Sequence, residues 1–259
     1  MFQHVRIERG PIAELVLARP DARNAMTVAM GDEVAAAVAE LDRDPAVRVV
    51  LVRGEGKAFC AGGDLGFLEQ RLSDTREGNT RAMGLFYRRF LSIRNLRVPT
   101  IAVLHGAAMG AGLCFALGCD LRLAARTAPL GLNFVRLGLH PGMGATYLLP
   151  QLVGPAIAAD LLLTGRTIDG TEAARIGMVN EALDDDALMP RARELAGLIA
   201  SAGPLAVTAC KRSLGAARGT LEQALDGEAL AQAEDYATRD LAEGVRAARE
   251  RRTPSFEGK

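Results

Sequence analysis

The first two-thirds of the chain alternates between strand-like and helix-like patterns of apolar residues. Alternating apolar and polar residues predict a hairpin whose strands span Phe2–Arg9 and Ile12–Ala18. Helical periodicity predicts helices over Val28–Leu41 and Thr80–Leu96. Short apolar runs predict buried strands over Val47–Val52, Thr100–Leu104 and Asp120–Ala125. This rhythm indicates an α/β domain whose helices pack outside the strands.

The last third of the chain has a different pattern. From Asp184 onward no strand-like run occurs, and four helices are predicted, over Ala187–Ala200, Pro204–Ala217, Leu221–Thr238 and Asp240–Arg251. We therefore expect two parts, an α/β core over residues 1–183 and a helical C-terminal region over residues 184–259.

Composition and charge narrow the function classes. The chain has 259 residues, 49% of them hydrophobic, which suffices for a sizeable core. Lys+Arg and Asp+Glu number 31 each, so the basic excess typical of nucleic-acid-binding proteins is missing. No apolar run reaches the length of about 18 to 20 residues that a membrane span needs. The first ten residues lack the apolar segment of a secretory signal. We expect a soluble cytoplasmic protein with no nucleic-acid or membrane partner.

The four cysteines indicate reduced thiols, not a metal site. Cys60, Cys114, Cys119 and Cys210 form no CxxC pair, and the three histidines show no i, i+4 spacing. No bound metal is expected.

Two loops of small residues carry the most specific chemistry. Gly54–Asp64 and His105–Gly112 each follow a predicted buried strand and lead toward a helix. The N–H groups at a helix start lack intrahelical acceptors, and small side chains let a ligand approach them. Two such loops could direct two N–H groups at one carbonyl oxygen, as in an oxyanion hole, where each donor contributes about 3 to 4 kcal/mol. Alternatively, small residues serve only to let helices pack against strands.

Six segments together resemble one family. They are RPDARNAM (Arg19–Met26), GKAFCAGGDL (Gly56–Leu65), VPTIAVLHGAAMGAGLCFALGCDLRLAA (Val98–Ala125), LGLHPGMGAT (Leu137–Thr146), LTGRTIDGTEAARIGMVNEAL (Leu163–Leu183) and PSFEGK (Pro254–Lys259). In order and spacing they resemble the crotonase, or enoyl-CoA hydratase/isomerase, superfamily. The resemblance implies a spiral of repeated ββα units and a helical C-terminal region that forms a homotrimer or a dimer of trimers. It also implies acyl-CoA substrates, with coenzyme A part of the substrate and no further cofactor.

The resemblance places the oxyanion-hole N–H groups on Cys60 and Ala111. It implies that coenzyme A and the acyl group lie along Ala22, Arg23, Ala25, Ala58, Ala61, Gly62, Asp64, Leu65, Gly110, Cys114 and Phe134. Lys57 and Lys259 are further candidate partners of the phosphates, beside Arg23.

Two of these positions depart from the family pattern. The resemblance implies catalytic glutamates where this chain has Cys114 and Phe134, and Gly142 stands where some relatives have an aspartate. Because a positioned acid or base typically contributes about 10²- to 10⁴-fold, these replacements are expected to cripple ordinary hydration.

Other residues could replace the missing carboxylates. His140 is the candidate base, since imidazole titrates near neutral pH, although a histidine before proline is also an ordinary loop residue. Asp64 is expected to cap the next helix, Glu69 to face solvent, His105 to make a structural hydrogen bond and Asp120 to accept from backbone donors. Packing accounts for the three tyrosines, which are otherwise candidate proton donors.

Two function classes stay open from the sequence. One is an acyl-CoA enzyme that catalyses hydration, isomerisation, decarboxylation or hydrolysis with a changed set of acid–base groups. Decarboxylation forms an enolate without a strong base, so an oxyanion hole alone lowers much of its barrier. The other is a non-catalytic acyl-CoA-binding protein in which Phe134 forms an apolar wall.

Overall fold

The computed structural model describes residues 2–216 and 220–259. Its larger sheet has six strands in the order β1-β2-β3-β5-β7-β10. The bounds are β1 (Val5–Glu8), β2 (Ile12–Leu17), β3 (Val49–Gly54), β5 (Thr100–Leu104), β7 (Leu121–Ala125) and β10 (Glu181–Leu183). β1 and β2 form the predicted antiparallel hairpin, and the pairs from β2 to β10 are parallel. The α/β fold predicted from the sequence is confirmed.

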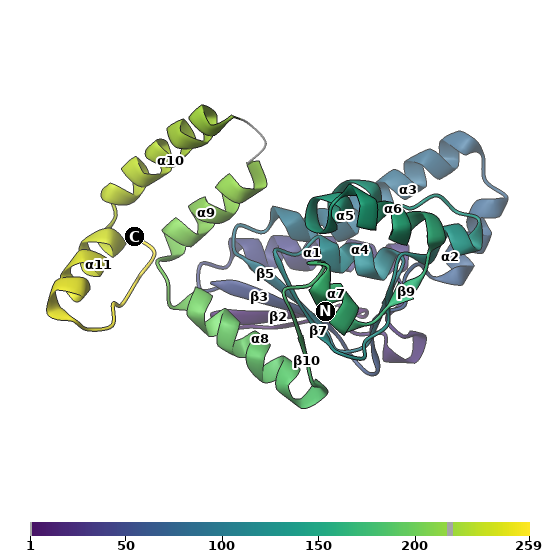
Figure 1. The fold of residues 1–259 in the computed structure, drawn as a ribbon, viewed down its shortest axis with the longest axis horizontal. Helices are drawn as coiled ribbons and strands as arrows, with labels where there is room; N and C mark the ends of the chain where they lie inside the picture. The colour runs from purple at the N-terminus through teal and green to yellow at the C-terminus, as the bar shows by residue number, and fades with distance from the viewer. Residues whose placement is uncertain (1, 217–219) are drawn as a thin grey trace.

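A second sheet has four strands in the order β4-β6-β8-β9. Its strands are β4 (Ala58–Cys60), β6 (Ala107–Met109), β8 (Leu130–Gly131) and β9 (Thr167–Ile168). Each of the successive pairs β3–β4, β5–β6 and β7–β8 gives its first strand to the large sheet and its second to the small one. Helices follow each pair, so the chain winds through repeated ββα units, as the resemblance implied (Figure 1).

The helices of the core are α1 (Val28–Arg43), α2 (Leu65–Leu72), α3 (Arg76–Leu91), α4 (Ala111–Leu117), α5 (Ala145–Val153), α6 (Pro155–Thr164) and α7 (Gly170–Arg175), with 3-10 turns at η1 (Pro20–Ala22), η2 (Ser92–Asn95) and η3 (Asn133–Leu137). Of the core helices, α1 begins and ends close to the predicted positions. α1 buries Val34, Val38 and Leu41, the face that periodicity predicted.

The predicted helix over Thr80–Leu96 has the wrong bounds. The Thr75 hydroxyl accepts a hydrogen bond from the Gly78 N–H, which starts α3 at Arg76, one polar turn earlier than the apolar pattern indicated. At the other end the helix stops at Leu91, and residues 92–95 continue as a 3-10 turn.

Within the described part of the chain, four helices follow the last strand. They are α8 (Asp185–Ala200), α9 (Pro204–Ala216), α10 (Leu221–Tyr236) and α11 (Arg239–Glu250). α8 packs on the large sheet through Leu188, Ala192 and Ala196, whereas α9–α11 extend from the body as an arm (Figure 1). The predicted end of the α9 helix at Ala217 lies outside the described residues. The tail folds back, and the Lys259 carbonyl accepts from the N–H groups at the start of α11.

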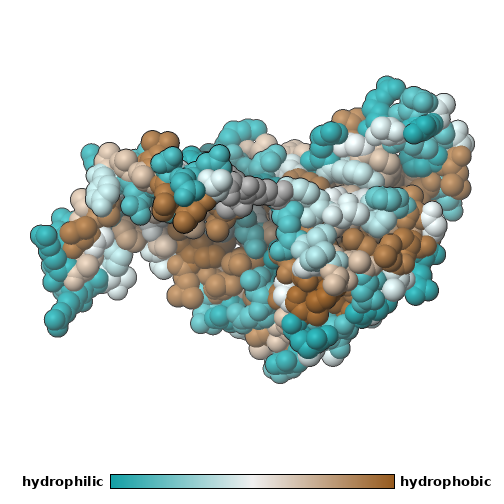
Figure 2. Space-filling model, turned by 45° about the horizontal axis from the view of Figure 1, so that its top comes forward, coloured by the Kyte–Doolittle hydropathy of each residue, from teal (hydrophilic) through white to brown (hydrophobic). Residues whose placement is uncertain are grey.

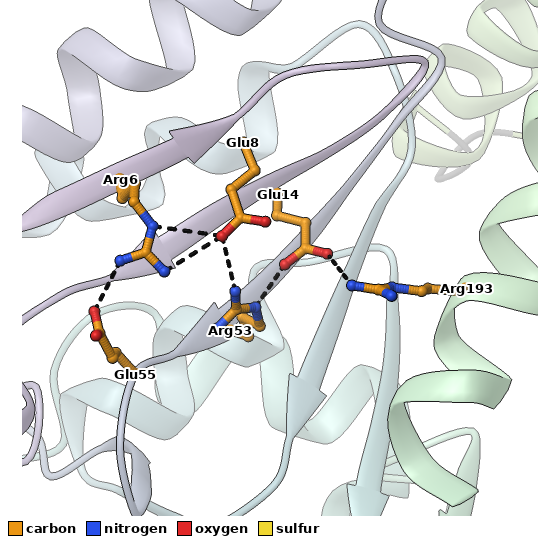
Figure 3. Close-up of polar contacts among 6 residues, drawn as sticks. All are labelled: Arg6, Glu8, Glu14, Arg53, Glu55 and Arg193. Carbon is orange, nitrogen blue, oxygen red and sulfur yellow. Dashed lines mark hydrogen bonds and ion pairs between the residues drawn. The ribbon is translucent and has the colours of Figure 1, made fainter.

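Ion pairs bind α8 to the N-terminal strands. Glu14 on β2 is buried, and its carboxylate accepts from Arg53 Nε at 2.6 Å and from Arg193 Nη2 at 3.1 Å (Figure 3). Arg53 also donates to Glu8, which extends the network to Arg6 and Glu55. Since Arg193 belongs to α8, the network holds the first C-terminal helix against the sheet.

Candidate functional site

The two small-residue loops meet in van der Waals contact. Cys60 ends β4, and β4 lies parallel to β6, which leads into α4 at Ala111. A methyl group on Gly112 would lie 2.4 Å from the Cys60 carbonyl oxygen and 2.7 Å from its Sγ. Only glycine fits at this distance, because real Cβ atoms do not approach other atoms so closely. The start of α4 therefore lies directly on the backbone of Cys60.

Gly62 makes the reciprocal contact from the first loop. A methyl group there would lie 2.7 Å from the Met109 carbonyl oxygen and 3.7 Å from the Ala111 nitrogen. Ala111 is the first residue of α4, so its N–H has no intrahelical acceptor. The structure thus brings together the segments that carry Cys60 and Ala111, the two residues expected to donate to a carbonyl oxygen.

The segment Ala22–Ala25 is hydrogen-bonded to the same loop. The Ala61 N–H donates to the Arg23 carbonyl at 2.9 Å, and the Met26 N–H donates to the Gly62 carbonyl at 2.7 Å. The buried Asn24 side chain donates to the carbonyls of Ala58 (2.9 Å) and Phe59 (3.2 Å). Asn24 was not among the predicted site residues, although an asparagine next to small residues is a signal for the left-handed conformation that it adopts.

The charged residues of these segments lie at the surface. Arg23 and Lys57 are exposed, as is Leu65 at the start of α2. Asp64 is the N-cap of α2 and accepts from the Gly66 N–H at 3.1 Å, which confirms its predicted capping role. Lys259, in contrast, lies on the C-terminal arm, away from α4 within one chain (Figure 1).

The Cys60 thiol is buried and hydrogen-bonded. Its Sγ donates to the Asn24 carbonyl at 3.0 Å. Burial raises the pKa of the Cys60 thiol to about 12, so the thiol is neutral at physiological pH. The Cys60 side chain therefore contributes to structure, and the residue as a whole is buried.

Cys114 and Phe134 lie close to the segment that carries Ala111. Cys114 is fully buried on α4, its Sγ is 3.5 Å from the Gly142 carbonyl, and burial raises its pKa above the usual range. A methyl group on Gly110 would lie 3.8 Å from Phe134 Cζ, so the phenyl ring adjoins the turn before Ala111. Neither a thiol with a raised pKa nor a phenyl ring can act as the carboxylate base of the family pattern.

Tyr87 comes to the same place from α3. A methyl group on Gly142 would lie 2.4 Å from Tyr87 Oη, so the hydroxyl fills the space that a side chain at position 142 would occupy. Burial raises the pKa of Tyr87. Tyr87 could not be distinguished from a packing tyrosine in the sequence, because residues 87 and 142 are brought together only by the fold.

The histidines and Glu69 lie elsewhere. His140 is exposed, with Nδ1 2.8 Å from the Pro141 carbonyl, and it borders an apolar pocket of about 570 Å³ together with Val135, Leu139, Leu162 and Leu163. His105 Nε2 lies 3.0 Å from the Gly56 carbonyl, the structural hydrogen bond expected of it. Glu69 is exposed, and Asp120 accepts from the Thr100 N–H at 2.8 Å, also as expected.

Comparison with known proteins identifies the family of the chain. The model of the enoyl-CoA hydratase/isomerase family matches residues 8–259. Human mitochondrial enoyl-CoA hydratase domain-containing protein 2 is 41% identical over 270 residues, covering 98% of this chain and 89% of its own. The crotonyl-CoA hydratase of Syntrophomonas wolfei is 38% identical over 258 residues, covering 98% of each chain. The crystal structure of a putative enoyl-CoA hydratase from Streptomyces coelicolor superposes with a TM-score of 0.94 at 35% identity, covering 100% of this chain and 96% of that one.

The chain belongs to the enoyl-CoA hydratase/isomerase family, a family of enzymes. The resemblance to the crotonase superfamily that the sequence motifs carried is confirmed.

Proposed function

We propose that the protein is an acyl-CoA enzyme that holds the thioester carbonyl oxygen between the N–H groups of Cys60 and Ala111. The observation that carries the proposal is the direct contact of the two loops, Gly112 against Cys60 and Gly62 against Met109. Two N–H donors fixed in this way stabilise the negative charge that develops on the oxygen of an enolate, by about 3 to 4 kcal/mol per donor.

Coenzyme A runs, in this proposal, along the joined segments 22–25 and 58–65. Small residues let the pantetheine and adenine approach the backbone, and the exposed Arg23 and Lys57 offer charge to the phosphates. Residues proposed to line this path and the acyl end are Ala22, Arg23, Ala25, Ala58, Ala61, Gly62, Asp64, Leu65, Gly110, Cys114 and Phe134. Coenzyme A enters as part of the substrate, and no other cofactor is proposed.

The chemistry proceeds without the family's pair of glutamates. Positions 114 and 134 carry a thiol and a phenyl ring, and position 142 has no side chain. Reactions that need water activated by a carboxylate are therefore disfavoured, and those that form an enolate by other means are favoured. His140 borders the neighbouring apolar pocket and is the nearest imidazole candidate in sequence to Phe134.

The proposed assembly is a homotrimer or a dimer of trimers formed through residues 184–259. α10 has no buried residue, and large apolar side chains on the arm are exposed, among them Leu205, Leu214, Leu221, Leu225 and Leu230. Figure 2 shows apolar residues gathered on the arm and where it meets the body. A surface of this kind is typical of subunit contacts.

The proposed location is the cytoplasm. Within residues 2–216 and 220–259, no helix has the length and apolar content to cross a membrane. Cys60, Cys114, Cys119 and Cys210 are free thiols, as is usual in a reducing compartment.

Turnover of a thioester series tests the proposed function. Wild-type protein is incubated with enoyl-, malonyl- and aryl-CoA esters, and products are followed by mass spectrometry. Ala111→Pro deletes one proposed N–H at the first helical position, where proline is tolerated, and Ala111→Gly keeps that N–H. We expect turnover of at least one ester, lowered about 10²- to 10³-fold by Ala111→Pro and little changed by Ala111→Gly. Tight binding of every ester without turnover would mean a non-catalytic acyl-CoA-binding protein.

A further inference from the structure

We propose that Tyr87 is a catalytic residue whose hydroxyl delivers a proton to the α-carbon of an enolate formed by decarboxylation of a malonyl-type thioester. The inference rests on the proposed function, because it needs a thioester held at Cys60 and Ala111. It adds the proton donor and the substrate class.

The Tyr87 hydroxyl lies close to the start of α4, where the thioester is proposed to bind. Tyr87 Oη occupies the space beside Gly142, and the Gly142 carbonyl accepts from Cys114 Sγ. Cys114 belongs to the first turn of α4, which begins at the proposed donor Ala111. The hydroxyl therefore lies on the side of α4 where the family pattern places a carboxylate, and glycine at 142 is what leaves room for it.

The Tyr87 hydroxyl also has no hydrogen-bond partner among the described residues. Among residues 2–216 and 220–259, no side chain or carbonyl hydrogen-bonds to Tyr87 Oη, although the residue is half-buried. A phenol O–H normally finds a partner when it is partly buried. A free donor beside the segment that carries Ala111 is available to a ligand.

The side chain is held firmly by its helix. Phe86 and Phe90 on α3 are buried, and the Tyr87 ring packs edge-on against Phe86 with centroids 6.4 Å apart. α3 in turn packs on α1. Because these contacts hold the Tyr87 ring, the hydroxyl has its position before a ligand binds, as efficient proton transfer requires.

The residues at positions 114, 134 and 142 favour a reaction that forms the enolate without a base. Cys114, Phe134 and Gly142 offer no carboxylate to remove an α-proton, so the enolate has to arise without deprotonation. In the proposed step the bond between the α-carbon and a carboxylate breaks, and CO₂ leaves. The electron pair moves onto the thioester oxygen, where the N–H groups of Cys60 and Ala111 stabilise it. The carbonyl re-forms as the α-carbon takes the Tyr87 proton, and a solvent proton restores the phenol.

Tyr87→Phe tests the step with the ring retained. Malonyl-CoA is the probe, turnover is run in D₂O, and product is analysed for deuterium at the α-carbon. We expect wild type to release CO₂ and form singly deuterated acetyl-CoA. Tyr87→Phe should lower kcat about 100-fold or more with KM little changed. Tyr236→Phe, which removes a hydroxyl from an exposed tyrosine on α10, is the matched control and should keep the wild-type rate.

The outcomes separate this inference from the proposed function. If Tyr87→Phe keeps the wild-type rate, or if its KM and thermal unfolding temperature change along with kcat, Tyr87 is not the proton donor. If wild type leaves malonyl-CoA intact but turns over another ester, the substrate class is wrong and the thioester site stands. If wild type turns over no ester at all, both proposals fall.

Discussion

Glu14 and Cys114 are both buried, yet their surroundings differ in kind. Glu14 lies between two arginines in a network that joins β1, β2, β3 and α8 (Figure 3). The Cys114 thiol lies 3.5 Å from the Gly142 carbonyl, and the Tyr87 hydroxyl lies beside the same glycine. The fold thus retains a buried carboxylate where arginines satisfy it, and has a thiol at the position where the resemblance implies a catalytic carboxylate. Charge stabilises the structure in the first region, whereas in the proposed function backbone N–H groups act on the substrate in the second.

Removing Arg53, the less exposed of the two arginines that contact Glu14, should have the largest effect. Arg53→Met leaves the Glu14 carboxylate buried with only the exposed Arg193 as partner, and breaking such a pair costs about 3 to 5 kcal/mol. Arg193→Met removes a partner whose side chain is 62% exposed, so its cost should be about 0 to 1 kcal/mol. Urea unfolding of the two variants measures the difference. An equal decrease in the free energy of unfolding for both variants would mean that burial does not determine how much each ion pair stabilises the fold.

A carboxylate placed at position 114 would be buried without the arginine partners that Glu14 has. Cys114→Glu puts an ionisable group beside Gly142 and Tyr87 without an arginine to pair with it, and should lower the free energy of unfolding by about 2 to 4 kcal/mol. Cys114→Ser is the control for loss of the thiol, and should cost less. Urea midpoints at neutral pH check both. A Cys114→Glu protein as stable as wild type would show that the pocket already solvates a charge.

The pH dependence of the Glu14 pair should be the smallest effect. Burial alone would raise the pKa of Glu14, but hydrogen bonds from Arg53 and Arg193 outweigh it and hold the pKa below its usual value. A lowered carboxyl pKa stabilises the folded state above the unfolded pKa of about 4.3, and this stabilisation is lost as the pH falls through the folded pKa.

Glu14→Gln isolates this contribution. It should be less stable than wild type by about 1 to 2 kcal/mol at pH 7, and the gap should close as the pH falls below about 4. Urea midpoints of both proteins between pH 7 and pH 3 supply the comparison. A gap that is constant with pH would place the stabilisation in packing instead of charge.

The elements and motifs were largely predictable, and the contacts between distant residues were not. Apolar periodicity identified α1 because that helix buries one face. A continuous apolar run identified the strand β5, whose residues are all buried. Periodicity misplaced the start of α3, since the first turn is polar and only the Thr75 cap marks it. The six motifs located the two loops. Their glycines Gly62 and Gly112 are required because a Cβ atom there would clash with the other loop.

The contacts of Tyr87 and Asn24 could not be predicted from the sequence. Tyr87 is one position on an amphipathic helix, and nothing local indicates that Gly142 lies against its hydroxyl. Asn24 braces β4 from another segment of the chain, through carbonyls that have no sequence signature. Both assignments depend on tertiary packing, which brings together residues far apart in the chain.

The carbonyl stretching frequency of a bound thioester tests the central claim most directly. Wild type and Ala111→Pro are each saturated with an acyl-CoA carrying ¹³C at the thioester carbonyl, and infrared difference spectra are recorded. Two N–H donors at Cys60 and Ala111 should polarise the carbonyl and shift its band to lower frequency in wild type, and Ala111→Pro should lose most of that shift. A wild-type band at the frequency of the free ester, or an unchanged shift in Ala111→Pro, would contradict the account.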